Sequence, residues 1–500
     1  MTEIVSGASE YDVIVLGGGP AGENAAAYAV AGSDRTAAIV ERERVGGECS
    51  YWACVPSKAL LRPGHVLAAA RGLPGVEGRG PDVAAVLRRR DEFVHARDGD
   101  HDDSSQLDWA AQQGIDVIRG AGRLTGERTI RIGERELRAR RAVVLATGTR
   151  AAVPDIPGLR DALPWTSRDV TNLHEIPKRV VVIGGGVVAC EAATWLSVLG
   201  AEVTVLVRGD GLLTGVEAFA GEMVAAALTG RGVTVQFGTS PARVQRPAAA
   251  NHGEGRIHGG PVTVHAVGPD GESTLLADEI VVAAGRTPNS GDLGLETVGL
   301  DAGYVEVDDQ LTATGVPGEW LYAVGDINHR AALTHMGKYQ GRVCGDVIAA
   351  RAEGRSLTAP RHRASADHRA VPQVVFTDPE VAAVGLTAAA ARAAGHDIRS
   401  VGLDIEVAGS ALTRDDYRGH AALVIDNTTD TVLGATFVGP DIGEQLHAAT
   451  IAVAGRVPLD ALWHAVPAFP AVSEFWLRLL ETDRSSLPSA DERNRTDHDH

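Results

Sequence analysis

Cysteine is scarce in this sequence, with four residues in a chain of 500. That number is far too small for a secreted scaffold held together by disulfides. In a reducing compartment, two cysteines that stand close together are therefore expected to be catalytic or metal-binding rather than structural. No apolar run reaches the length of a membrane span, and no basic stretch is followed by an apolar leader segment. We accordingly expect a cytoplasmic protein with no membrane partner.

An excess of basic residues is also missing. Lys and Arg together number 47 against 65 Asp and Glu, which gives a formal net charge of −18. This balance argues against a general binder of nucleic acid or of membrane surfaces. Hydrophobic residues make up 44% of the chain, which is enough for sizeable cores. A chain of this length is expected to hold roughly two to four domains.

The segment YDVIVLGGGPAGENAAAYAVAG predicts a strand, a glycine turn and a helix. Its turn fits the pattern G-x-G-x-x-G through Gly17, Gly19 and Gly22. Such glycines allow a tight turn, close approach of the backbone to a pyrophosphate, and close packing of a helix whose N-terminus favours negative charge. A second apolar run ends in Glu41, whose carboxylate is placed to bind a ribose. The segment predicts a dinucleotide site, and the alternative is a tight turn without a ligand.

The same pattern returns in RVVVIGGGVVACEAATWLSVLGAEVTVLVRGDG, where Gly184, Gly186 and Ala189 take the three motif positions. Two such units predict two nucleotide sites. The acidic residue expected after the second strand is absent, because Val207 stands there and Arg208 follows it. A guanidinium attracts a 2′-phosphate, which a carboxylate would repel. We therefore expect NADPH rather than NADH, and the alternative is an Arg208 side chain that only faces solvent.

Cys49 and Cys54 lie close together in GGECSYWACVPSKALL, with four residues between them. This is not a zinc spacing, and no second Cys/His pair follows at a finger-like distance, so we expect no metal. A disulfide needs Cα atoms roughly 4.4–6.8 Å apart, whereas residues five apart on a regular helix are separated by about 7.5 Å along its axis. We expect a distorted helix between the cysteines, because Pro56 has no N–H to bond the carbonyl of Trp52. The spacing disfavours a metal clamp, and the nucleotide motifs favour a redox pair over a structural staple.

GGECSYWACVPSKALL resembles the active-site helix of the class I pyridine nucleotide–disulfide oxidoreductases, which include dihydrolipoamide dehydrogenase and the glutathione, mycothione and mercuric reductases. Further segments that resemble the family pattern are VVLATGT (143–149), VVAAGRTPN (281–289), TGVPGEWLYAVGD (314–326), LTHMGKYQGR (333–342) and VVFTDPEVAAVGLT (374–387). The resemblance implies an α/β fold with two Rossmann-like domains, for FAD and NAD(P), and a C-terminal α+β dimerisation domain. The implied boundaries are 1–160 and 291–365 for the two parts of the FAD domain, 161–290 for the NAD(P) domain, 366–482 for the dimerisation domain and 483–500 for a disordered tail.

The resemblance also implies a role for each motif residue. Cys54 would be the thiol nearest the flavin, Cys49 the interchange thiol that meets substrate, and Lys58 and Glu191 a pair beside the flavin ring. A cation there would stabilise negative charge that develops on the flavin. The implied cofactor-binding residues are Gly17, Gly19, Gly22, Glu41, Lys58, Thr147, Gly148, Gly184, Gly186, Ala189, Arg208, Gly285, Gly325 and Asp326. The implied partners are a second copy of the chain and a small-molecule electron acceptor.

The C-terminal segment departs from the family at one catalytic position. Disulfide reductases of the family complete their site with an acid–base histidine of the partner subunit, in the pattern His-x-His-Pro-Thr-x-[Ser/Thr]-Glu. In PAFPAVSE, Glu474 and Pro470 match this pattern, and Glu474 keeps its catalytic assignment, while Phe469 replaces the histidine. Because phenylalanine cannot move a proton, we expect reduction by NADPH to persist and fast turnover with lipoamide or glutathione disulfide to be absent. Mercuric reductase also lacks this histidine, but it carries a C-terminal cysteine pair, and no cysteine follows Cys344 here.

The expected protein is an FAD-dependent oxidoreductase that passes hydride from NADPH, or from NADH, through flavin to a Cys49–Cys54 disulfide and on to an unidentified acceptor. One alternative is a quinone or dye reductase, or a transhydrogenase-like flavoenzyme, in which the cysteine pair is dispensable. Val187 stands where the family often has a gating tyrosine, which favours small planar acceptors. Another alternative is a structural FAD-binding subunit. Tyr51 and Trp52 could form an aromatic platform or pack into the core.

Other parts of the chain carry no predicted chemistry. Residues 71–106 are polar and are expected to form a mobile surface helix and loop. Residues 246–260 are expected to form a hairpin loop whose two histidines face solvent. Cys190 and Cys344 are expected to be packing residues.

Overall fold

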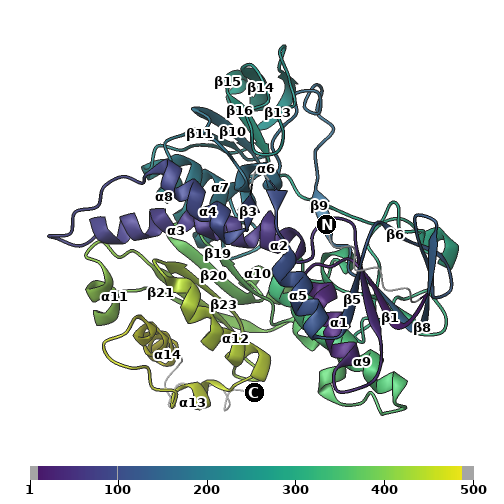
Figure 1. Ribbon diagram of the computed structural model, residues 1–500. Helices are drawn as coiled ribbons and strands as arrows, with labels where there is room; N and C mark the ends of the chain where they lie inside the picture. Colours follow the sequence, from purple (N-terminus) through teal and green to yellow (C-terminus); the bar gives the residue numbers. More distant parts are fainter. Residues whose placement is uncertain (1–8, 98–99, 487–500) are drawn as a thin grey trace.

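The protein's structure, a computed structural model, describes residues 9–97 and 100–486 and is organised around three main sheets (Figure 1). The first is a seven-stranded sheet in the order β5-β2-β1-β8-β7-β6, with β18 added beside β8. Its strands are β1 (Glu10–Leu16), β2 (Ala37–Glu41), β5 (Ile115–Arg119), β6 (Gly122–Gly126), β7 (Thr129–Ile132), β8 (Arg135–Leu145) and β18 (Leu321–Ala323). The parallel strands β1, β2 and β8 are buried along most of their length, as expected for a sheet covered on both faces.

The second sheet is parallel and has the order β12-β11-β10-β16, which is the arrangement expected of a second nucleotide-binding unit. Its strands are β10 (Arg179–Ile183), β11 (Glu202–Leu206), β12 (Thr234–Gln236) and β16 (Glu279–Val282), and an antiparallel sheet of β13 (Ser240–Gln245), β14 (Val262–Gly268) and β15 (Gly271–Ala277) adjoins it. The chain enters this unit through β9 (Thr149–Ala151) and leaves it through β17 (Arg286–Pro288), and these two strands pair. The chain therefore passes from the first unit to the second at β9, which lies before the expected domain boundary at residue 160.

The third sheet is antiparallel, in the order β19-β20-β23-β22-β21, and it belongs to the C-terminal α+β part of the chain. Its strands are β19 (Pro372–Val375), β20 (Glu380–Gly385), β21 (Ile398–Asp404), β22 (His420–Asp426) and β23 (Thr431–Gly439). The predicted fold class of two α/β units followed by an α+β domain is therefore confirmed.

Helices cover these sheets and join them. They are α1 (Pro20–Val30), α2 (Gly47–Tyr51), α3 (Cys54–Arg71), α4 (Val83–Phe93), α5 (Ser104–Gln112), α6 (Ser167–Thr171), α7 (Val187–Val198), α8 (Ala218–Gly230), α9 (Thr334–Ala352), α10 (Ala388–Ala393), α11 (Ala408–Thr413), α12 (Leu446–Gly455), α13 (Leu459–Leu462) and α14 (Phe475–Ser486). Short 3₁₀ turns are η1 (Leu295–Val298), η2 (Gly325–Asn328), η3 (Pro360–His362), η4 (Ser365–His368), η5 (Ile442–Gln445) and η6 (Val472–Glu474), and a short hairpin joins β3 (Ala96–Arg97) and β4 (Asp100–His101).

Helices α1 and α9 lie side by side although more than 300 residues separate them in the chain (Figure 1). A stripe of glycines at four-residue spacing on α9 allows this approach. A Cβ atom on Gly341 would lie 2.5 Å from the carbonyl oxygen of Ala21, and one on Gly345 would lie 2.5 Å from the Cβ of Tyr28. The stripe thus sets how closely α9 packs against the helix that follows the first glycine turn.

Substitution within this stripe is expected to weaken the fold. Gly341→Ala should lower the free energy of unfolding by about 1–3 kcal/mol, because its methyl group overlaps the backbone of α1. Gly230→Ala is the matched control, since this helical glycine has no neighbouring atom within 4 Å of an added Cβ. Thermal unfolding should show a lower midpoint for Gly341→Ala alone, and an unchanged midpoint would contradict the packing described here.

Two sequence expectations about peripheral segments are corrected by the structure. The 71–106 segment is not only a surface helix and loop, because Val94 is fully buried and Arg90, 1% exposed, donates a 2.8 Å hydrogen bond to the carbonyl of Leu173. In the 246–260 loop, His252 faces solvent, but His258 is buried with Nδ1 2.7 Å from the carbonyl of Leu163. Both segments pack onto the second unit through groups that are distant in sequence.

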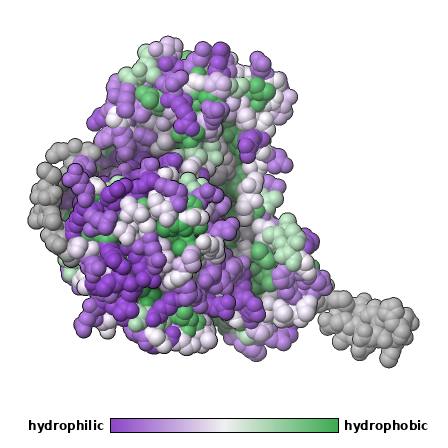
Figure 2. All heavy atoms as spheres, turned by 90° about the vertical axis from the view of Figure 1, so that its right-hand side faces the viewer, coloured by the Kyte–Doolittle hydropathy of each residue, from purple (hydrophilic) through white to green (hydrophobic). Residues whose placement is uncertain are grey.

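The chain's C-terminal end is ordered further than expected. Helix α14 runs to Ser486, and Asp483 is 3% exposed and lies 2.6 Å from Nε of Arg399. The rest of the expected 483–500 tail lies outside the described residues. Within the described part of the chain, no helix is both long and apolar enough to cross a membrane. Figure 2 shows a face on which hydrophilic side chains predominate and apolar ones form small patches.

Candidate active site

The first glycine turn packs too closely for any side chain. Gly17 has φ of +107°, and a Cβ there would lie 2.3 Å from the carbonyl oxygen of Ala146. A Cβ on Gly22 would lie 2.1 Å from the carbonyl oxygen of Gly17. Gly19 is the N-cap of α1, a Cβ added there would have its nearest contact at 3.9 Å, and no side chain caps the helix. The turn therefore presents free backbone N–H groups to an open space, which fits a pyrophosphate.

Glu41 lies at the end of β2 beside this turn. Its Oε2 accepts a 2.7 Å hydrogen bond from the N–H of Gly18, and its Oε1 accepts one of 2.7 Å from the N–H of Glu43. These bonds fix the carboxylate at the edge of the glycine turn. The position fits the ribose-binding role predicted from the sequence.

The second glycine turn repeats this construction at β10 and α7. Gly184 has φ of +134°, and a Cβ there would lie 2.3 Å from the carbonyl oxygen of Ala283. Gly186 is the N-cap of α7 and has no atom within 4 Å of a would-be Cβ, while Ala189 is fully buried behind it. After β11, Val207 is 3% exposed and Arg208 faces solvent. The site thus offers a cation, with no carboxylate at the strand end.

One continuous cavity of about 1810 Å³ connects the two turns. Its volume exceeds the roughly 300–1,000 Å³ of an ordinary small-molecule site, which fits two dinucleotides placed end to end. The predicted residues that line it are Gly17, Gly19, Glu41, Cys49, Cys54, Lys58, Thr147, Gly148, Gly184, Gly186, Glu191, Arg208, Gly285, Gly325 and Asp326. The predicted Gly22 and Ala189 lie behind the two turns and support them.

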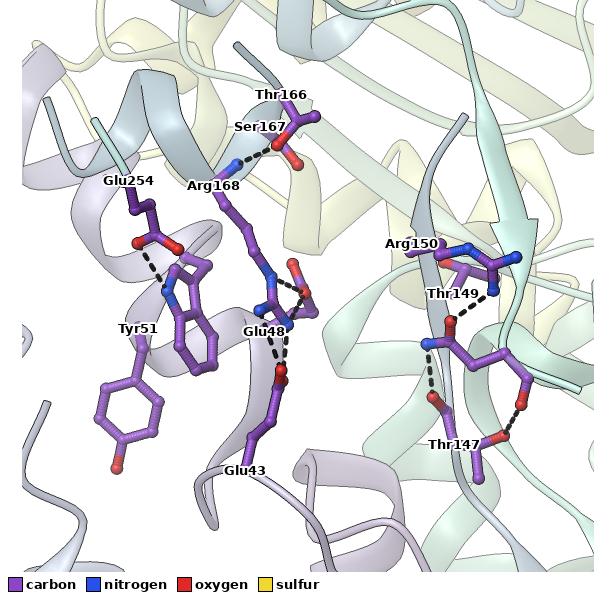
Figure 3. A network of polar contacts seen from close by, with 12 residues as sticks. Glu43, Glu48, Tyr51, Thr147, Thr149, Arg150, Thr166, Ser167, Arg168 and Glu254 are labelled. Atoms are coloured by element: carbon purple, nitrogen blue, oxygen red, sulfur yellow. Dashed lines mark hydrogen bonds and ion pairs between the residues drawn. The ribbon is translucent and has the colours of Figure 1, made fainter. Parts of the chain in front are cut away.

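Between the turns, β9, β17 and η2 position the polar residues of the first unit. The hydroxyl of Thr149 donates a 2.7 Å hydrogen bond to Oδ2 of Asp326. The hydroxyl of Thr147 donates one of 2.9 Å to the carbonyl of Asn289, whose side-chain amide returns one of 3.0 Å (Figure 3). Asp326 keeps one carboxylate oxygen outside this bond, which fits a hydroxylated chain of a bound flavin.

The cysteine pair spans a break between two helices, as the sequence predicted. Helix α2 ends at Tyr51 and α3 begins at Cys54, and between them Ala53 has φ of −140° and ψ of −93°. Both cysteines are free thiols in this structure, and Sγ of Cys54 lies 3.2 Å from the hydroxyl of Thr334. The pKa of Cys54 is lowered, first by a hydrogen bond from Cys49 and further by Thr334 and Lys58. The pKa of Cys49 is raised, because it donates that hydrogen bond and because it is buried.

Lys58 and Glu191 meet in the cavity beside Cys54. The Lys58 ammonium lies 2.9 Å and 3.1 Å from the two carboxylate oxygens of Glu191, which also accepts a 2.9 Å hydrogen bond from the N–H of Phe376. The ammonium also lies 4.7 Å from the centre of the Phe376 ring. Because Glu191 is 4% exposed while Lys58 is 36% exposed, the carboxylate fixes the lysine and leaves its charge facing the cavity.

An ionic network that sequence analysis missed joins the cysteine segment to the second unit (Figure 3). Arg168 of α6 lies 2.5 Å from Glu48 and 2.8 Å from Glu43, and its guanidinium lies 4.2 Å from the Trp52 ring. The Trp52 indole N–H donates a 3.0 Å hydrogen bond to Glu254. Trp52 is 7% exposed, so it packs into the structure rather than forming an open platform, and Tyr51, 2% exposed, does the same.

Glu474 and Phe469 do not line the cavity of their own chain. Glu474 is 9% exposed and accepts a 2.8 Å hydrogen bond from Arg478, whereas Phe469 is 76% exposed. Val466, nearby, is 82% exposed. A catalytic role for Glu474 stays a prediction.

The cavity, with two nucleotide turns and a dithiol between them, defines a flavin-dependent pyridine nucleotide oxidoreductase. Sequence comparison matches residues 11–341 to the family described as "Pyridine nucleotide-disulphide oxidoreductase" and residues 371–479 to its dimerisation domain. The chain therefore belongs to this family of FAD-dependent enzymes, which use NAD(P)H. The match to the dimerisation domain supports a homodimer.

Relatives whose names carry different substrates are similar to the chain at comparable levels. A mercuric reductase from Acidithiobacillus ferrooxidans is 32% identical over 469 residues, covering 91% of this chain and 79% of the relative. A dihydrolipoyl dehydrogenase from Chlamydia trachomatis is 30% identical, covering 93% and 95%. The HOCl-induced flavoprotein disulfide reductase RclA from Escherichia coli, solved as a Cu(II) complex, superposes with a TM-score of 0.77 at 24% identity, covering 95% and 99%. This structural likeness shows the fold alone.

Proposed function

We propose that this enzyme oxidises NADPH and passes the electrons through FAD to the Cys49–Cys54 pair and on to a small-molecule acceptor. The observation that carries the proposal is the single cavity lined by both nucleotide turns and by both cysteines. Bound FAD would supply hydride acceptance and an electron pair for the disulfide. The scarcity of cysteine in the chain supports a cytoplasmic setting.

The residues around the cysteine pair and the nucleotide turns would each have a separate role. Lys58, held by Glu191, would stabilise negative charge near the flavin and on Cys54. The hydroxyl of Thr334 would hold the Cys54 sulfur in place, since the two atoms are 3.2 Å apart. Cys49 would then be the sulfur that meets the acceptor. Arg208 would bind the 2′-phosphate and so select NADPH.

Phe469 limits the choice of acceptor. In the disulfide reductases that the chain resembles, a partner histidine protonates the leaving thiolate, and such acid–base help contributes about 10²–10⁴-fold. We therefore expect slower turnover with lipoamide or glutathione disulfide than with an acceptor that needs no proton from that position.

The test is an anaerobic titration with NADPH followed by a panel of acceptors: lipoamide, glutathione disulfide, a quinone and Hg²⁺. The flavin absorbance should bleach with NADPH, and one acceptor should restore it rapidly. Failure of NADPH and of NADH to bleach the flavin would overturn the proposal.

A second candidate function is quinone or dye reduction that does not use the cysteines. Val187 favours it, because this residue lines the cavity at the N-terminus of α7 where the resemblance places a gating tyrosine. The Cys54→Ser variant separates the two functions. Unchanged NADPH–quinone turnover in that variant would support the second candidate.

A further inference from the structure

The backbone break between the two cysteines contains a carbonyl group that lacks its usual helical donor. Trp52 lies in this break, and the residue four positions later is Pro56, which has no N–H to donate. A buried carbonyl without a donor costs free energy. The hydroxyl of Thr171, at the end of α6, lies 3.0 Å from the Trp52 carbonyl oxygen and donates a hydrogen bond to it. Because Trp52 and Thr171 are both buried, this hydroxyl replaces the missing N–H.

The same hydroxyl also joins the break to α6. It lies 3.0 Å from the carbonyl of Ser167 and 3.1 Å from that of Arg168, both in α6, so its proton is held between this helix and the break. Asn172 adds a second contact, since its side-chain amide lies 3.4 Å from the carbonyl of Tyr51. That amide also donates a 2.8 Å hydrogen bond to Glu254. Two successive carbonyls at the end of α2 thus meet side chains of one short segment.

Arg168 holds the chain on the other side of Cys49 (Figure 3). Glu48, which directly precedes Cys49, accepts a 2.6 Å hydrogen bond from Nε of Arg168, and Glu43 accepts one of 2.8 Å from the same guanidinium. The guanidinium also lies 4.2 Å from the centre of the Trp52 ring. Helix α6 therefore contacts the chain before Cys49 as well as the chain between the two cysteines.

Helix α6 is itself fixed within the second unit at both ends. Before the helix, Trp165 exchanges two backbone hydrogen bonds of 2.8 Å with β16, the edge strand of the second parallel sheet. After it, the buried Arg90 donates hydrogen bonds to the carbonyls of Thr171 and Leu173. The place of the cysteine segment is therefore tied to the sheet of the second unit.

A disulfide closes only when its two Cα atoms lie roughly 4.4–6.8 Å apart. Contacts that hold both sides of the break restrict how far the two thiols can separate, which raises the effective concentration of each thiol for the other. A higher effective concentration favours the disulfide over the dithiol. We propose that Thr171 and Arg168 are positioning residues through which the second unit lowers the reduction potential of the Cys49–Cys54 pair. This inference rests on the proposed redox function of the pair and adds a means by which the second unit regulates it.

The test measures the thiol–disulfide equilibrium of the pair in the FAD-loaded protein, without NADPH. The protein is equilibrated anaerobically with an excess of reduced and oxidised dithiothreitol at a series of ratios, quenched with acid and alkylated. The peptides that carry Cys49 and Cys54 are then quantified by mass spectrometry. In this exchange the protein disulfide opens to two thiols while one molecule of dithiothreitol closes to its ring disulfide, so two electrons and two protons pass to the pair.

Thr171→Val keeps the shape of the side chain but removes the hydroxyl. It should raise the equilibrium constant for reduction of the pair about fivefold, which corresponds to about 20 mV for a two-electron couple. Thr171→Ser keeps the hydroxyl and should stay close to the parent protein. Thr194→Val is the matched control, because this buried hydroxyl donates a 2.8 Å hydrogen bond to the carbonyl of Cys190 in its own helix and lies outside the cavity lining. The control should leave the equilibrium constant unchanged.

Arg168 offers a second pair of variants. Arg168→Gln removes the ion pairs with Glu43 and Glu48 and should also raise the equilibrium constant for reduction about fivefold. Arg168→Lys keeps the positive charge without the paired donors, so its equilibrium constant should lie between those of Arg168→Gln and the parent protein. Because the Arg168 side chain is partly exposed, these variants do not open the core, and they test the proposal even if Thr171→Val fails to fold.

The proposal is wrong if Thr171→Val and Arg168→Gln both match Thr194→Val. It is also wrong if Thr171→Ser raises the equilibrium constant as much as Thr171→Val, because the hydroxyl would then have no part in the effect. A parent pair that stays reduced at every dithiothreitol ratio would overturn the redox function itself and this inference with it. A parent pair that oxidises while all variants match it would overturn only the positioning by α6.

Discussion

Replacing Cys54 with serine is expected to lower NADPH-driven reduction of a disulfide acceptor by at least about 10³-fold, as expected for loss of a covalent nucleophile. Serine cannot form the disulfide that would carry the electron pair from the flavin to the acceptor. The hydroxyl of Thr334 and the charge of Lys58 would remain, but they would have no thiolate to stabilise. Anaerobic bleaching of the flavin by NADPH should continue, because hydride transfer does not involve this sulfur.

The matched control is Cys344→Ala, which removes a fully buried cysteine of α9 that does not line the cavity. This variant should keep disulfide turnover close to that of the parent protein. Equal turnover by Cys54→Ser and the parent would show that electrons do not pass through the pair.

Replacing Arg208 with alanine is expected to reduce kcat/KM for NADPH by about 10–100-fold, because a charge-assisted hydrogen bond is worth about 1.5–3 kcal/mol. The kcat/KM for NADH should change little, since NADH has no 2′-phosphate. Arg208 is solvent-exposed in the cavity lining, and no carboxylate stands beside it at the end of β11, where Val207 is buried. Steady-state kinetics with both nucleotides measure the effect.

Arg208→Lys serves as the matched variant, because it keeps the positive charge but loses the paired donors of the guanidinium. The kcat/KM of this variant for NADPH should lie between the values of the parent enzyme and of Arg208→Ala. A parent enzyme that prefers NADH would contradict the assignment of Arg208.

The local features of the site were predictable because they depend on short stretches of chain. The glycine turns at Gly17 and Gly184 follow from the steric needs of a strand, a turn and a helix. The helix break before Cys54 follows from the missing N–H of Pro56 and appears between α2 and α3. The pairing of Lys58 with Glu191 could be expected only through the family resemblance, since 133 residues separate them.

The features that sequence analysis missed depend on contacts between distant segments. Thr334 meets Cys54 only because α9 packs on α1 through its glycine stripe. Arg168 reaches Glu48 from another unit, and no periodicity or spacing marks that pairing. The burial of His258 has the same origin, because a polar loop sequence does not reveal which backbone carbonyls will surround it.

The measurement that tests the central claim most directly is differential alkylation of the cysteines before and after anaerobic reduction. The oxidised, FAD-loaded protein is treated with stoichiometric NADPH and quenched with a labelled alkylating reagent, and each cysteine peptide is quantified by mass spectrometry. Cys49 and Cys54 should be unlabelled before NADPH and labelled after it, while Cys190 and Cys344 should not change. A flavin that is reduced while Cys49 and Cys54 keep the same labelling would contradict the transfer of electrons through this pair.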